Sequence, residues 1–502
     1  MHIGQVLNSV YDEEVGWRPA SGNVKPVHVA NGLVRALCGR SYDTTRLNHF
    51  VRWTAKGGQA DEDRSFAALV ERGDPEGVFA SFADAPTEFE RARRYTHGLL
   101  NNDKTVYPSV RDSAFTLTCA QMVSLSPNDR GLGEFGAALL SGGAAEALAE
   151  ELRRALQTEL PQDPISAAVW PLLESEGHEE RRPERAAKAL KRKHNQQILD
   201  QFRNAAGTLA KHERAQGNRL RTLQRGVHFV CVAPQVHAQA LAANGDLAKR
   251  PPALLALSGG YGSPVAIASQ HSLDLIHKGF QRWLGNQLTA RLEAGRPLAE
   301  KEAPLELKSS DARAIRAVLQ QIGGASKADQ GEPASKEVLD ARIADYADAR
   351  RRLGDKATLV LGHALVAAYA REFESGGPKE FIQGLSRKAG LLFPHFEGRA
   401  REKRIRPSVP MLDMIVRACV EAGSLVPIDE FLERLWLRFG LIIGTRSTED
   451  WSDSEYLANH GIGLDPSALV ENGEALIAQL AQIGLARRYA DNVTYVGDAH
   501  GK

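Results

Sequence analysis

Cysteine is scarce in this chain, with four among 502 residues. Cys38, Cys119, Cys231 and Cys419 lie far apart, and no two of them form a C-x-x-C pair. A zinc knuckle and a disulfide framework both need regularly spaced cysteines, so the sequence predicts neither. Isolated thiols suit a reducing compartment, and we expect the protein in the cytoplasm.

Long apolar runs are also missing. The longest one, near residues 359–370, contains His363 and is well short of the roughly 20 residues that a membrane-spanning helix needs. The first fourteen residues lack the apolar segment that follows the basic residues of a signal peptide. We therefore expect no membrane among the partners.

The common catalytic motifs are absent as well. The sequence contains no H-E-x-x-H and no G-x-S-x-G. His271 and His277 are six residues apart, which is a poor spacing for two metal ligands on one helix face. The sequence therefore predicts no catalytic residue, no metal site and no cofactor, and it favours binding over catalysis.

Positive charge is concentrated in residues 181–225. This stretch carries thirteen Lys and Arg against three acids, although the whole chain has a net charge of only +1. A polyanion such as nucleic acid is the natural partner of such a segment. The candidate contacts are Arg181, Arg182, Arg185, Lys188, Lys191, Arg192, Lys193, Arg203, Lys211, Arg214, Arg219, Arg221 and Arg225.

The helical pattern of the same stretch leaves two interpretations open. Leu190, Ile198, Phe202 and Leu209 fall on one stripe, which predicts helix. Glycines at 207 and 217 make two helices as plausible as one. The basic residues then belong either to an anion-binding arm or to a linker helix that the charges keep in solution.

A glycine-rich segment follows a predicted strand. Residues 227–232 and 253–257 are rich in apolar residues and read as two strands, and a helix is expected after the second. The turn between the second strand and this helix offers amide groups that suit a phosphate. Its sequence matches no phosphate-binding motif, and ordinary helix capping explains the same residues. The possible anion-binding residues are Ser258, Gly259, Gly260, Gly262 and Ser263.

The fold predicted from these patterns is mainly α and multidomain. A second basic run precedes Pro407 and extends the candidate nucleic-acid contacts to Arg399, Arg401, Lys403, Arg404 and Arg406. Residues 323–335 are the best linker candidate. We expect a mostly helical N-terminal domain (1–175), a basic helical arm (176–226), a small α/β segment (227–322), a helical segment (336–406) and a C-terminal module (407–502).

The last hundred residues carry the most consistent local signals. Helices are predicted at 410–422, 428–439 and 466–483, followed by a hairpin closed by Asp491 and Asn492. This order resembles a winged helix, with Arg487 and Arg488 on the wing. The third helix is expected to show Glu471, Asn472 and Glu474 to solvent, which does not suit duplex DNA, so the pattern fits protein docking equally well.

Together these patterns predict a non-catalytic nucleic-acid-binding subunit, with DNA favoured over RNA, in a cytoplasmic assembly with other protein subunits. Bacterial genome maintenance and antiviral defence against phages are settings that would use such a subunit. Two alternatives stay open. One is an enzyme that acts on nucleotides or nucleic acid through the glycine-rich segment, and the other is a scaffold whose basic arm docks an acidic protein.

Overall fold

The chain is mainly helical, as the sequence predicted. The structure is a computed structural model, and no helix in the part of the chain that it describes is long and apolar enough to cross a membrane. It describes residues 2–19, 24–43, 46, 80–100, 129–156, 167, 170–173, 176–179, 184–191, 196–298, 303, 305, 311–324, 334–372, 377–395, 403–449, 451–490 and 493–498.

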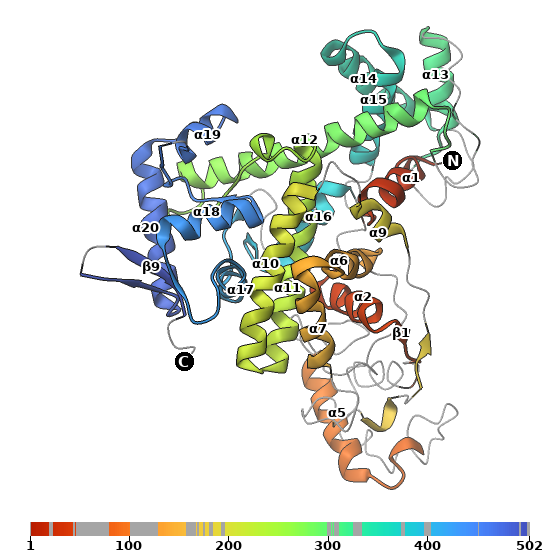
Figure 1. Ribbon diagram of the computed structural model, residues 1–502. Coiled ribbons are helices and arrows are strands. Elements are labelled where there is room, and N and C mark those ends of the chain that lie inside the picture. Colours follow the sequence, from red (N-terminus) through yellow and green to blue (C-terminus); the bar gives the residue numbers. More distant parts are fainter. Residues whose placement is uncertain are drawn as a thin grey trace.

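Helices make up most of these residues (Figure 1). They are α1 (Asn8–Val10), α2 (Pro26–Cys38), α5 (Pro86–Leu100), α6 (Leu132–Leu140), α7 (Glu146–Ala155), α9 (Glu184–Leu190), α10 (Gln196–Gln216), α11 (Arg219–Ala242), α12 (Pro264–Glu293), α13 (Ala312–Gln321), α14 (Lys336–Leu353), α15 (Ala357–Glu372), α16 (Pro378–Lys388), α17 (Val409–Cys419), α18 (Ile428–Phe439), α19 (Asp453–Asn459) and α20 (Pro466–Gln482). The short helical turns are η1 (Ile3–Gln5), η2 (Tyr11–Val15), η4 (Ala80–Phe82), η7 (Gly143–Ala145), η8 (Trp170–Leu172) and η10 (Leu247–Lys249).

The strands are short and form small sheets. Two pairs are antiparallel, β1 with β2 and β4 with β5, whereas β3 pairs with β7 in parallel. The remaining three form an antiparallel sheet in the order β6-β9-β8. Their bounds are β1 (Arg40–Ser41), β2 (His178–Glu179), β3 (Ala253–Leu254), β4 (Leu392–Phe393), β5 (Arg404–Ile405), β6 (Leu425–Pro427), β7 (Leu441–Ile442), β8 (Ala486–Arg488) and β9 (Thr494–Gly497).

Two sets of helices organise the molecule (Figure 1). The pair α10–α11 packs against α17 on one side and against α7 on the other. The long helix α12 crosses the molecule from α20 to the α14–α15 pair. One hydrophobic cluster runs from Ile3 to Val496 and includes buried residues from all five predicted parts of the chain. The division into separate domains therefore stays a prediction.

The basic stretch forms separate helices. The helical stretch breaks between α10 and α11 at Gly217, which adopts a left-handed φ of 62° that favours glycine. Asn218 then caps α11 by accepting a hydrogen bond from the Arg221 amide. Of the two alternatives drawn from the sequence, the interrupted helix is the one present.

The predicted strand at residues 227–232 is wrong, because this segment lies in the middle of α11. Residues 225–241 are buried without interruption, since helices surround α11. A short β-branched run that is buried on every side has the same composition in a strand and in a core helix. Packing decided the outcome here against the local β-propensity.

Of the second predicted strand, at 253–257, Ala253–Leu254 form β3, and the helix expected after it is α12. Ser263 caps α12 by accepting a hydrogen bond from the Ala266 amide, and Pro264 occupies the first turn. In the C-terminal hundred residues, the three predicted helices and the hairpin are present as α17, α18, α20 and β8–β9. A further helix, α19, lies between α18 and α20, where the sequence predicted none.

Candidate functional site

The basic side chains that the structure describes in the stretch 181–225 differ in what they contact. Arg181, Arg182, Arg192 and Lys193 lie outside the described residues, as does the side chain of Arg185. Lys188 and Lys191 are exposed near the end of α9.

Three cations of α10 form ion pairs within the protein. Arg203 is 2.8 Å from Asp200 and also donates to the Leu139 carbonyl. Lys211 is 2.9 Å from Glu421, which precedes β6. Arg214 is 2.8 Å from Glu151 of α7, and the Glu151 contact raises the pKa of the guanidinium. These residues therefore join α10 to its neighbours.

Arg225 is the most deeply buried cation among the described residues of the stretch. Its Nη1 is 2.9 Å from the fully buried Glu213, and its Nε is 2.7 Å from Asp413 of α17. Gln216 accepts a further hydrogen bond from Nη1. A guanidinium whose donors meet two carboxylates inside the core is not accessible to a phosphate, so the geometry does not support Arg225 as a nucleic-acid contact.

Arg219 and Arg221 remain exposed at the end of the hairpin where α10 meets α11. Neither forms an ion pair with a carboxylate in the described part of the chain. Leu220 between them is 50% exposed. This hairpin end and the exposed Lys191 after α9 are described parts of the basic stretch that could meet a polyanion.

The second basic run is partly internal. Arg399 and Arg401 lie outside the described residues. Lys403 is half-buried and donates to Gln383, and burial lowers the pKa of its ammonium. Arg404 is buried, and its guanidinium and that of Arg406 lie 4.7 and 5.7 Å from the ring centre of Phe393. Cation–π contacts of this kind hold both side chains against the protein.

The three glycines of the glycine-rich segment are exposed, but Ser258 is buried and its amide is occupied. The Ser258 amide donates to Asn472 Oδ1 at 3.1 Å, and Ser263 caps α12. Gly259 and Gly262 have left-handed φ angles, whereas a side chain at Gly260 would meet nothing within 4 Å. Ordinary turn and cap geometry explains these residues, and anion binding stays a prediction.

The outer face of α20 carries no basic residue among Pro466–Gln482. Glu471 and Glu474 are exposed there, as expected, and Val470 is 60% exposed. Asn472, expected on the same face, is instead fully buried. Its amide nitrogen donates to the carbonyls of Leu255 and Ile443, which follow β3 and β7. Asn472 therefore fastens α20 to the parallel β3–β7 pair.

One apolar stripe of α20 is buried. Leu469, Leu476 and Leu480 are at most 3% exposed, and Ile483 is half-buried. Leu469 shares a buried cluster with Trp436 of α18. Arg487 and Arg488 are exposed on β8, where Arg488 lies 3.6 Å from Glu474, and the tip at 491–492 is outside the described residues.

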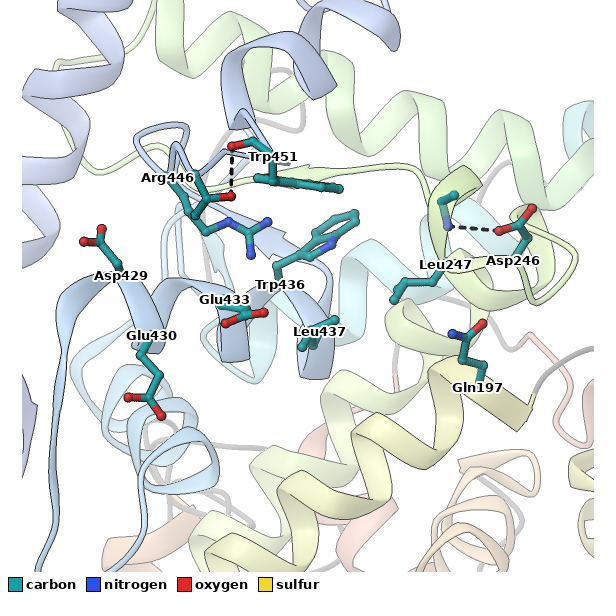
Figure 2. Close-up of a pocket in the computed structure, with 12 residues that line it drawn as sticks. Gln197, Asp246, Leu247, Asp429, Glu430, Glu433, Trp436, Leu437, Arg446 and Trp451 are labelled. Atoms are coloured by element: carbon teal, nitrogen blue, oxygen red, sulfur yellow. Dashed lines mark hydrogen bonds between the residues drawn. The ribbon is translucent and has the colours of Figure 1, made fainter.

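A cavity of about 620 Å³ opens beside α18 (Figure 2). Apolar side chains and carboxylates line it, and Arg446 extends among them from the loop after β7. The lining residues are Gln197, Asp246, Leu247, Ala248, Asp429, Glu430, Glu433, Trp436, Leu437, Arg446, Thr448 and Trp451.

Asp453 fixes one wall of this cavity. The carboxylate is 1% exposed and accepts hydrogen bonds from Trp451 Nε1 at 2.7 Å and from the Arg446 amide at 3.1 Å. The Arg446 guanidinium lies 4.6 Å from the centre of the Trp451 ring. Tyr456 stacks on Trp451 at 4.6 Å, so the loop before α19 is held rigidly.

Arg250 fixes the end of α18 that carries the lining residues Trp436 and Leu437. It is fully buried and donates to the Trp436 and Leu437 carbonyls at the end of α18, where a cation also complements the helix dipole. Burial lowers the pKa of Arg250 to about 9. Gly440 ends α18 with a left-handed φ of 65°, and its amide donates to the Trp436 carbonyl. The backbone of Trp436 is therefore held by both Gly440 and Arg250.

This cavity could not be predicted from the sequence, because its residues are distant in the chain. The spacing of Arg446, Trp451 and Asp453 within eight residues was the available signal, but only the fold brings them to Trp436.

The histidines give no sign of a metal centre in the described residues, where no group of three or more His, Cys, Asp or Glu is placed to hold an ion. His277 is 3% exposed, and neither ring nitrogen has a hydrogen-bond partner. Burial lowers the pKa of His228 to about 4 and that of His277 to about 3. Both rings are therefore neutral core residues near pH 7.

No model of a known protein family matches this chain, and no curated protein matches it either.

Proposed function

We propose that this chain is a non-catalytic subunit of a multiprotein assembly and that its C-terminal part is a winged-helix-like module that docks a protein. The order α17, β6, α18, α20, β8, β9 and the sheet order β6-β9-β8 support the winged-helix assignment. α19 is then an insertion before the third helix. The cytoplasm remains the proposed location.

The outer face of α20 carries the docking proposal. In a DNA-binding winged helix this surface would meet phosphates and bases and would be basic. Here Val470 lies between exposed carboxylates, and the neighbouring helix α12 presents Ile267, which is 57% exposed. Val265 of α12 and Leu469 of α20 share a buried cluster, so these two helices pack together. An apolar patch with acidic neighbours fits a protein surface better than a duplex.

Partner capture by surface variants tests this proposal. The tagged full chain is expressed in its source cells, and bound proteins are quantified by mass spectrometry. Val470→Asp should preserve the fold and remove a stoichiometric partner, whereas Leu220→Asp, at another exposed apolar residue, should retain it. Equal partner recovery with both variants would contradict docking through α20.

Nucleic-acid binding is the second candidate, and the hairpin end favours it. Arg219 and Arg221 are exposed cations without an ion-pair partner in the described part of the chain. Each phosphate contact steepens the log–log dependence of duplex affinity on salt by about 0.9. Changing both residues to Gln should therefore reduce the slope by about 1.8. Fluorescence anisotropy with duplex DNA measures it, and an unchanged slope would exclude this contact.

A further inference from the structure

The cavity beside α18 combines apolar side chains with four carboxylates, two of which form ion pairs within the protein. Trp436, Leu437 and Leu247 supply apolar surface. Glu430 pairs with Arg434, and Asp246 pairs with Lys249 at 3.1 Å. Such a surface suits the hydrocarbon stem of a long cationic side chain.

Two other carboxylates of the cavity form no ion pair within the described part of the chain. Asp429 and Glu433 are exposed on α18, four residues apart and therefore on one face of the helix. Neither has an ion-pair partner among the described residues. An incoming cation would find both carboxylates free to form charge-assisted hydrogen bonds.

Arg446 is a second and independent sign of a ligand. Its side chain is 7% exposed, and its Nη2 has no hydrogen-bond partner in the described structure. Figure 2 shows its guanidinium extending between Trp451 and Glu433. A buried donor without an acceptor is costly. A carbonyl oxygen of a ligand that reaches this nitrogen would provide that acceptor.

We propose that this cavity binds a basic segment of a partner protein. One main-chain carbonyl of the segment meets Arg446, and an arginine or lysine side chain lies along Trp436 and ends between Asp429 and Glu433. Charge complementarity selects this occupant, because the carboxylates at the rim repel nucleic-acid phosphates. A cavity of about 620 Å³ also has room for more than a single amine.

This site is separate from the docking face of α20. It is built by α18, the turn at Asp246–Ala248 and the loop that carries Arg446 and Trp451. The inference therefore goes beyond the proposed function. Loss of partner capture by Val470→Asp and loss of binding at this cavity are distinguishable results.

Calorimetry on the full chain tests the inference with defined probes. The first probe is an acetylated and amidated peptide, Gly-Arg-Gly-Arg-Gly. The second replaces both arginines by citrulline, which keeps the shape and removes the charge. The third is guanosine monophosphate, which tests a nucleobase as the occupant. The variants are Asp429→Asn and Glu433→Gln, and Glu455→Gln is the matched control on α19, exposed but outside the cavity.

The arginine peptide should bind, and citrulline should weaken binding at least about tenfold, equivalent to about 1.4 kcal/mol. Asp429→Asn and Glu433→Gln should each cause a similar loss, while Glu455→Gln should leave affinity unchanged. These substitutions are at exposed positions, and thermal melts check that the fold is kept. Absence of peptide binding at millimolar concentration, equal binding of the citrulline peptide, or preferential binding of the nucleotide would each overturn the proposal.

Discussion

The hairpin α10–α11 and the cavity beside α18 are both charged, but their charges have different surroundings. In the hairpin, Arg225 meets Glu213 and Asp413 inside the core, and Lys211 and Arg214 pair with carboxylates of other elements. In the cavity, Asp429 and Glu433 face solvent without an ion-pair partner among the described residues. Charge density along a sequence therefore does not reveal which charges are available to a ligand, because pairing in the fold decides it.

The largest expected effect comes from breaking a buried pair of the hairpin. Arg225→Leu leaves the buried carboxylate of Glu213 without its cation and should lower the free energy of unfolding by about 3–5 kcal/mol. Arg221→Leu, four residues earlier and exposed, should change it by no more than about 0.5 kcal/mol. Urea unfolding measures both, and similar losses from the two variants would remove the distinction between paired and unpaired arginines.

A comparable contrast is expected within the cavity wall. Asp453→Asn removes the charge that balances the buried Arg446 and places an amide where several donors converge, so a loss of about 3 kcal/mol is expected. Glu433→Gln should be nearly neutral, because the carboxylate is not used in the fold. Thermal unfolding checks this. Equal stability of Asp453→Asn and wild type would show that the carboxylate does not hold the wall.

Unlike the buried charges of the hairpin, the buried histidines His228 and His277 stay neutral in the native protein near pH 7. Burial depresses the pKa of His228 to about 4 and of His277 to about 3, whereas both titrate near 6.5 when unfolded. Below pH 6.5 the unfolded chain takes up protons that the native chain does not. The free energy of unfolding should thus fall between pH 6.5 and about 4, by about 1.4 kcal/mol per pH unit for each histidine.

His277→Leu separates this contribution from that of the carboxylates. The variant should lose one histidine's share of the slope between pH 6.5 and 4 and keep the same slope above pH 7. Urea unfolding at a series of pH values measures it. An unchanged acid slope would mean that His277 is protonated in the native protein.

The smallest effect is expected on the wing. Arg487 and Arg488 are exposed on β8, so changing both to Ala should alter the free energy of unfolding by no more than about 0.5 kcal/mol. If the wing contacts DNA, the same change weakens duplex affinity. If the module docks a protein instead, as proposed, anisotropy measurements should show duplex affinity unchanged.

Local patterns predicted what depends on neighbouring residues. The stripe of Leu469, Leu476 and Leu480 and the cap at Ser263 were recognisable because a helix places such residues at fixed spacing. The segment 227–232 was not, because burial on every side of α11 removes the periodicity that separates a helix from a strand. The prediction that Asn472 faces solvent was wrong, because its burial depends on hydrogen bonds to carbonyls beside the β3–β7 pair, which is distant in the sequence.

The candidate site was harder to predict than the fold. The basic residues were visible as a run, but the partners that occupy them lie far away in the chain, as Glu421 does for Lys211 and Asp413 for Arg225. The cavity likewise joins residues from 197 to 451. Long-range contacts of this kind leave no periodic signal in one sequence.

The coupling free energy between Arg225 and Glu213 tests most directly whether the hairpin's charges are occupied by the fold. Urea unfolding of Arg225→Leu, Glu213→Gln and the double variant gives this quantity. We expect a coupling of about 1–3 kcal/mol, with the double variant less destabilised than the sum of the two single changes. Additive losses, with a coupling near zero, would show that Arg225 is not held by Glu213 and would contradict the account.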